Sequence, residues 1–147
     1  MTEVKRFRMT PLRRFGDMIM PVPVKLGLIP HTYMLTTRGR KTGKPRSHPV
    51  TLVEQDGRRW LVAPYGPVGW VHNARAAGTV RITRRGEDRE FAVREAGAEE
   101  AGPILKQYLK ITGPPKAYFR ATPDSPVAEF VAEASDHPVF ELVPTAR

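Results

Sequence analysis

The chain has 147 residues, of which 40% are hydrophobic and 27% are charged, a composition typical of one globular domain. It contains no cysteine, which excludes disulfide bonds and thiolate metal sites, and its four histidines show no metal-ligand spacing, so no metal site is expected. No apolar run approaches the roughly 18 residues of a membrane-spanning helix and no signal peptide is recognisable, so a cytoplasmic location is expected.

The formal charge of +9 is concentrated in the first third of the chain. Residues 1–50 contain eleven Lys or Arg against two acidic residues, whereas residues 51–147 contain thirteen of each sign. A role in general solubility would spread the excess over the whole surface. The distribution therefore indicates a local anionic partner, which is a phosphorylated or carboxylated cofactor, an anionic membrane or a nucleic acid.

Residues 1–23 form a basic amphipathic segment, and residues 24–147 are expected to form the folded domain. Thr10 and Pro11 suit the cap and the first position of a helix, which can continue over residues 12–20. Two interpretations of this segment stay open. Its apolar face packs on the domain, or the segment makes a peripheral contact with the inner face of an anionic membrane.

A basic turn follows between two predicted strands, Thr32–Thr37 and Ser47–Glu54. The stretch between Leu35 and Pro49 holds five cations and two glycines. These residues are Arg38, Gly39, Arg40, Lys41, Gly43, Lys44 and Arg46. Glycines expose backbone N–H groups, and a turn this basic suits an anion such as phosphate or carboxylate.

The elements after the turn predict a mainly antiparallel arrangement. The first are a hairpin at Asp56-Gly57, an apolar run at Trp60–Ala63 and a helix over Trp70–Ala77 that ends at Gly78. A second hairpin follows around Arg85-Gly86-Glu87. The last elements are a helix over Ala98–Ile111, a helix capped by Ser125-Pro126 and a strand over Val139–Val143. Hairpin connections of this kind do not build a parallel sheet. We therefore expect a mainly β (α+β) fold, in which helices pack around a small barrel.

Trp70 and Asn73 lie one turn apart on a predicted helix and therefore share a face. An aromatic ring and an amide suit the face and the edge of a planar ligand. Together with the basic turn, they indicate a site for a large, flat, polyanionic cofactor. A nucleic-acid module is not expected, because no aromatic residue lies between the cations of Arg38–Arg46.

Several motifs resemble the deazaflavin-dependent nitroreductase family. They are Leu-Thr-Thr-x-Gly-Arg-Lys-Thr-Gly-x-Pro-Arg at 35–46, x-Pro at 48–49, Leu-Val-Ala at 61–63 and Trp-x-x-Asn-x-x-Ala at 70–76, within a similarity that covers most of residues 30–95. The resemblance implies a split β-barrel like that of the FMN-binding, pyridoxamine-phosphate-oxidase-like proteins. It also implies coenzyme F-420, an 8-hydroxy-5-deazaflavin, as cofactor. FMN remains the alternative, although its single phosphate needs fewer cations than this turn provides.

The resemblance also assigns roles to individual positions. Arg40, Lys41 and Thr42 would hold the phosphate and the oligoglutamate tail, while Gly39 and Gly43 would let the backbone approach the cofactor. The remaining contacts would come from Arg46, His48, Pro49, Ala63, Trp70 and Asn73. One departure is the short loop of residues 64–69, where many members have a longer loop with a lysine.

The activity implied by the resemblance is hydride transfer between the deazaflavin and a planar apolar acceptor such as a quinone, an activated alkene or a nitroaromatic. Tyr65 and Tyr118 lie in loops rich in Pro and Gly, and with His48 they are candidate proton donors, although no residue is singled out by the sequence. A non-catalytic protein that binds the cofactor or a lipid stays open as an alternative. A homodimer is also left open.

Overall fold

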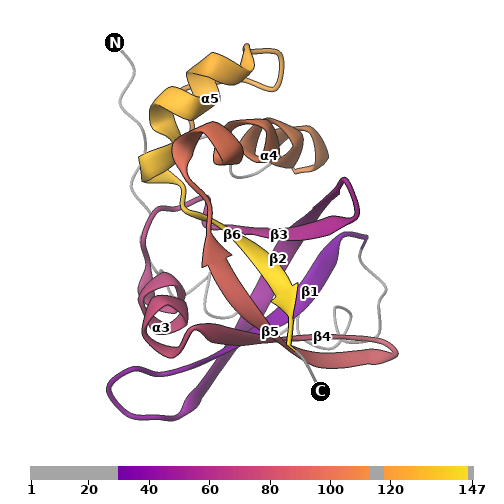
Figure 1. Cartoon of the computed structure of the whole chain (residues 1–147), viewed down its shortest axis with the longest axis vertical. Coiled ribbons are helices and arrows are strands. Elements are labelled where there is room, and N and C mark those ends of the chain that lie inside the picture. Colours follow the sequence, from indigo (N-terminus) through magenta and orange to yellow (C-terminus); the bar gives the residue numbers. More distant parts are fainter. Residues whose placement is uncertain (1–29, 113–117, 146–147) are drawn as a thin grey trace, which may run out of the picture.

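The computed structural model describes residues 30–112 and 118–145, in which six antiparallel strands close into a barrel (Figure 1). The order around the barrel is β1-β2-β3-β6-β5-β4, and β4 pairs back onto β1. The strands are β1 (Thr32–Arg38), β2 (Pro45–Gln55), β3 (Arg58–Val62), β4 (Thr79–Arg84), β5 (Glu87–Glu95) and β6 (Val139–Pro144). The helices are α3 (Gly69–Ala77), α4 (Ala98–Ile111), α5 (Val127–Glu133) and the short 3-10 helix η2 (Ala134–Asp136). The predicted split barrel with peripheral helices is confirmed.

Local sequence signals explain the two short hairpins. Asp56 and Gly57 have φ angles of 56° and 75°, which suit the left-handed two-residue turn that Asp-Gly favours. Gly86 has a φ of 77° in the turn between β4 and β5. Gly78, with a φ of 76°, ends α3 and donates its N–H to the carbonyl of Ala74.

The apolar side chains form two separate clusters because successive residues of a strand point to opposite faces. Leu52 packs inside the barrel, where Val71 and Ala74 of α3 join the same cluster. Its neighbour Val53 packs outside, beneath α4 and α5. Figure 1 shows α4 and α5 together over one end of the barrel, with α3 next to the long β1–β2 hairpin at the other.

Helix α4 has the predicted bounds. Its buried side chains include Ile104, Leu105, Tyr108 and Leu109, whereas Ile111 is partly buried. The predicted cap of α5 is wrong in one detail. The N-cap residue is Pro126 and no side chain caps the helix, because the Ser125 hydroxyl accepts the N–H of Thr122 instead.

The prediction for the N-terminal segment, a helix over residues 12–20 within residues 1–23, lies outside the described residues. In the part of the chain that the structure describes, no helix combines the length and the apolar character needed to cross a bilayer.

Candidate functional site

The basic turn between β1 and β2 is held by its own backbone. The N–H of Gly39 donates to the carbonyl of Lys44, and that of Gly43 donates to the carbonyl of Gly39, each at 2.8 Å. A Cβ at position 39 would lie 3.0 Å from the Thr42 hydroxyl oxygen and 3.2 Å from the Lys44 carbonyl, so the turn leaves little room for a side chain there. Gly43 adopts a φ of 72°, which favours glycine. Both glycines are therefore required by the shape of the turn.

Asn73 of α3 ties this turn to the barrel. Its Oδ1 accepts the backbone N–H of Arg40 at 3.2 Å and the guanidinium of Arg40 at 2.9 Å. Its Nδ2 donates to the hydroxyl of Thr37 at 3.2 Å. Asn73 is 6% exposed and Thr37 is 2% exposed, so these bonds are shielded from competing water. The amide therefore fixes the position of the turn relative to α3.

The cations of the turn point to solvent and stay outside the ion-pair network of the described residues. Arginines elsewhere in the described residues, such as Arg59, Arg75 and Arg81, each contact a carboxylate at 2.7–2.8 Å. Over residues 30–112 and 118–145, none of the five cations of the turn does so; they are Arg38, Arg40, Lys41, Lys44 and Arg46.

Two backbone groups at the tip of the turn add to this positive potential. Among the described residues, the N–H groups of Lys41 and Thr42 have no protein acceptor, whereas the hydroxyl oxygen of Thr42 accepts the N–H of Lys44 at 3.2 Å. Unsatisfied N–H groups next to several cations form an anion-binding concavity. The turn can therefore receive an anionic group from solvent.

Aromatic side chains lie near the turn at the start of α3. The ring centres of Trp70 and His48 are 6.1 Å apart at an interplanar angle of 43°, and Trp70 also lies 5.9 Å from Phe140 of β6. Both Trp70 and His48 are partly exposed. Arg46 and His48 are two residues apart on β2 and therefore share a face, whereas Pro49 points to the opposite face.

Ala63 and the two loop tyrosines lie at and beyond the end of β3 and in the loop before α5. Ala63 is fully buried in the barrel cluster, and its N–H donates to the carbonyl of Pro138 at 2.8 Å. Tyr65 and Tyr118 meet edge to face, with ring centres 4.7 Å apart at 75°. Tyr118 packs on the outer cluster under α4, in which burial raises the pKa of Tyr108. The structure therefore joins the two tyrosines to each other.

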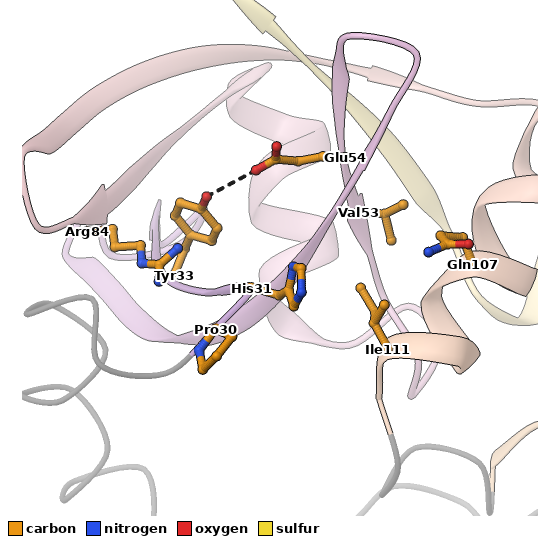
Figure 2. Close-up of a pocket in the computed structure, with 8 residues that line it drawn as sticks. All are labelled: Pro30, His31, Tyr33, Val53, Glu54, Arg84, Gln107 and Ile111. Carbon is orange, nitrogen blue, oxygen red and sulfur yellow. Dashed lines mark hydrogen bonds between the residues drawn. The ribbon is translucent and has the colours of Figure 1, made fainter.

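A hollow of about 340 Å³ lies at the opposite end of β1 from the basic turn (Figure 2). Its lining residues are Pro30, His31, Tyr33, Val53, Glu54, Arg84, Gln107 and Ile111. In it, Tyr33 donates to Glu54 at 3.3 Å, and the Arg84 guanidinium stacks 5.0 Å from the centre of the Tyr33 ring. None of the residues predicted for the cofactor site lines it.

A second hollow, of about 540 Å³, adjoins the basic turn and includes Thr37, Arg38 and Gly43. It extends along the outside of β1 and β4 to Arg81 and Glu90. Of these two hollows, this is the one that borders the candidate site.

A model of the F420H2-dependent quinone reductase family matches residues 11–132 of this chain. The chain belongs to this family. The protein is therefore an oxidoreductase, and as a member of an F420-dependent family it uses coenzyme F420.

Solved structures agree with the family and with its fold. A structure described as an F420-H2 dependent reductase is 27% identical to this family member, with a TM-score of 0.51 over 77% of this chain and 94% of that one. A chain described as a domain-swapped dimer is 24% identical, with a TM-score of 0.57 over 89% and 96% of the two chains. A Listeria innocua protein named for pyridoxamine 5′-phosphate oxidase is 13% identical, with a TM-score of 0.52 over 79% and 85%. The last two share the split-barrel fold. No curated protein sequence matches the chain.

The residues present fit the cofactor of the quinone reductase family. Its anionic tail requires cations without carboxylate partners, and its ring requires an aromatic neighbour. The turn supplies exposed cations and two available N–H groups, and the partly exposed Trp70 and His48 lie at the adjoining end of the barrel. Among the described residues, no group of three or more His, Asp or Glu is arranged to hold a metal ion.

Two features of the structure were not found from the sequence. Thr37 lies within the motif of the basic turn, but its bond to Asn73 depends on the position of α3 over the barrel. The buried pair of Glu133 and His137 is separated by four residues, a spacing that could have been noticed because such residues are neighbours on a helix.

Proposed function

We propose that this family member transfers a hydride between coenzyme F420 and a planar apolar acceptor, such as a quinone, an activated alkene or a nitroaromatic. The observation that carries the proposal is the basic turn, whose exposed cations have no carboxylate partner in the described residues and whose position is fixed by Asn73. When bound, the reduced deazaflavin supplies the hydride, and the protein supplies orientation and electrostatics.

In this proposal, the tail of the cofactor binds at the turn. Lys41 and Arg46 make charge-assisted contacts to its anionic groups, and the N–H groups of Lys41 and Thr42 donate to the same anions. Arg40 acts from a fixed position, because its guanidinium is already bonded to Asn73 at 2.9 Å. Gly39 and Gly43 let the backbone approach.

In the same proposal, the ring of the cofactor lies by Trp70 and His48, with Pro49 and Ala63 at the periphery. The partial exposure of Trp70 and His48 leaves an aromatic face available for stacking. A proton must accompany the hydride, and we assign its donor to His48, Tyr65 or Tyr118, each of which can donate from a side-chain N–H or O–H group. The acceptor would stack on the opposite ring face.

The tail site is tested by titrating the protein into coenzyme F420 and following the fluorescence of the deazaflavin. Lys41→Ala should weaken binding about tenfold, since it removes one charge-assisted contact. The matched control is Arg85→Ala, which removes an exposed cation from the tip of the other hairpin and should change the affinity by less than about twofold.

Added salt should weaken wild-type binding, because exposed charges are screened. Equal affinity of Lys41→Ala, Arg85→Ala and the wild type would reject the turn as the tail site. Tight binding of FMN in place of coenzyme F420 would instead favour the FMN-dependent alternative.

The acceptor also bears on where the protein acts. We propose that residues 1–23 contact an anionic membrane surface, because such a contact brings the site to a quinone dissolved in the bilayer. The cations of this segment and those of the turn together make up ten of the eleven Lys and Arg residues in positions 1–50. In the competing interpretation, the segment covers the barrel and the acceptor arrives from solution.

A further inference from the structure

Glu133 and His137 form a buried hydrogen-bonded pair outside the cofactor site. Their side chains are 2% and 3% exposed, and His137 Nε2 lies 2.9 Å from Glu133 Oε1. Glu133 is the last residue of α5, and His137 follows η2. Burying such groups is costly unless every polar atom has a partner, so their remaining contacts indicate what the pair is for.

Each remaining polar contact of the pair reaches a loop. His137 Nδ1 lies 2.9 Å from the carbonyl oxygen of Pro64 and must carry the proton, because a carbonyl only accepts. Glu133 accepts two backbone N–H groups, from Arg120 at 3.1 Å and from Ala121 at 2.8 Å. The two side chains therefore connect the loop after β3 to the loop before α5.

Both of these loops carry a tyrosine directly beside the contact. Pro64 precedes Tyr65, and Tyr118 precedes Phe119, whose ring stacks on the His137 imidazole at 3.7 Å and 9°. The two tyrosine rings meet edge to face at 4.7 Å. The buried pair thus holds the backbone on either side of an aromatic contact between residues 53 positions apart in the sequence.

We propose that Glu133 and His137 are positioning residues that hold Tyr65 and Tyr118 as a fixed aromatic wall for the acceptor. The proposal rests on the proposed function, in which Tyr65 and Tyr118 are candidate proton donors and therefore lie close to the acceptor. A planar acceptor gains most from aromatic side chains that are already ordered, because no entropy is then lost in ordering them on binding. Loosening the wall therefore weakens acceptor binding and leaves the distant tail site intact.

The test compares His137→Phe with wild type in the full chain. Phe keeps the stack on Phe119 and removes both hydrogen bonds. With 1,4-naphthoquinone as acceptor, we expect KM to rise about fivefold, as for the loss of one or two hydrogen bonds. The affinity for coenzyme F420, measured by fluorescence, should change by less than about twofold, since its tail binds at the basic turn, which neither Glu133 nor His137 contacts.

A control separates positioning from a loss of stability. Phe91→Leu removes buried volume from β5 beside Arg59 and Arg89, on an element that carries neither member of the pair nor either tyrosine. It should lower the thermal midpoint without raising KM for the quinone. His137→Asn, whose side-chain amide can still donate to Pro64, should recover part of the lost affinity for the acceptor. An equal rise in KM in Phe91→Leu, or an unchanged KM in His137→Phe, would overturn the proposal.

A second readout needs no turnover. Nitration by tetranitromethane, mapped by mass spectrometry, should increase at Tyr65 and Tyr118 in His137→Phe and stay constant at Tyr33, which is buried in the barrel. Unchanged nitration would overturn the positioning role even in an active enzyme. A rise in nitration in His137→Phe, together with a wild type that reduces no acceptor, would give a split result. Glu133 and His137 would still hold the two tyrosines, but the assignment of the tyrosines to an acceptor would fail together with the proposed function.

Discussion

At the scale of single residues, Asn73 shows how one amide can connect a binding turn to the fold. The sequence places Asn73 on the same helix face as Trp70 and suggests a contact with a planar ring. In the structure both polar atoms of the side chain bind protein groups, on Arg40 and Thr37. Its contribution to cofactor binding is therefore expected to act through the position of the turn.

Two substitutions of Asn73 separate stability from binding. Asn73→Ala should destabilise the fold by about 1–3 kcal/mol and weaken cofactor binding, because Arg40 loses its acceptor. Asn73→Asp keeps that acceptor and can accept from the Thr37 hydroxyl, so it should stay close to wild-type stability. Its added negative charge should still weaken binding of the anionic tail. Thermal unfolding measures the effect on stability, and fluorescence titration measures the effect on cofactor binding. If Asn73→Ala is as stable as the wild type, the hydrogen bonds of Asn73 to Arg40 and Thr37 do not stabilise the fold.

At the scale of elements, the close packing of α4 on α5 depends on Gly102. A Cβ built there lies 2.6 Å from Val131 Cγ2 and 3.2 Å from Val127 Cγ1. Valine has little rotamer freedom in a helix, so these methyl groups cannot move aside without a shift of α5. The absence of a side chain at position 102 therefore sets the distance between the helices.

Gly102→Ala should consequently destabilise the protein by about 1–3 kcal/mol, because the cost of overpacking exceeds the gain in helix propensity. Gly97→Ala, at the start of the same helix, is the matched control, since its Cβ would meet nothing within 4 Å. Chemical denaturation of the two variants gives the comparison. A more stable Gly102→Ala would mean that α5 adjusts and that helix propensity dominates.

At the scale of the whole molecule, the two halves of the chain use their charges differently. On the barrel, Arg94 joins β5 to Glu100 of α4 and to Glu141 of β6 at 2.7–2.9 Å, which raises the pKa of Arg94 and lowers that of Glu100. Such pairs link neighbouring elements and cancel charge locally. The net charge of +9 therefore resides in residues 1–50.

This asymmetry makes the membrane proposal testable by cosedimentation with anionic vesicles. Replacing Lys5, Arg6 and Arg8 by Gln should weaken vesicle binding roughly a hundredfold, at about 1 kcal/mol per cation near the surface. The control carries the same loss of charge at exposed positions elsewhere, through Gln at Arg85, Arg89 and Lys110. If both triple variants bind the vesicles equally, or if the wild type does not bind them, the membrane proposal is rejected. The competing interpretation, in which residues 1–23 cover the barrel, would then be favoured.

The sequence alone determined the local elements of the fold. Strand and helix positions follow from alternation and helical spacing within short windows, and α4 was predicted at its observed bounds. The hairpin at Asp56-Gly57 and the end of α3 at Gly78 follow from residues that tolerate a positive φ. The basic turn and its resemblance to the deazaflavin-dependent nitroreductase family could also be recognised from the sequence, because the motif at residues 35–46 is continuous in the chain.

Only the tertiary structure decided which of these residues meet. Barrel closure brings Asn73 to Arg40 across 33 positions and His137 to Pro64 across 73. Contacts of this kind depend on how helices seat on a closed sheet, which no local window of sequence encodes. Local propensity therefore accounts for the elements, and long-range packing accounts for the site.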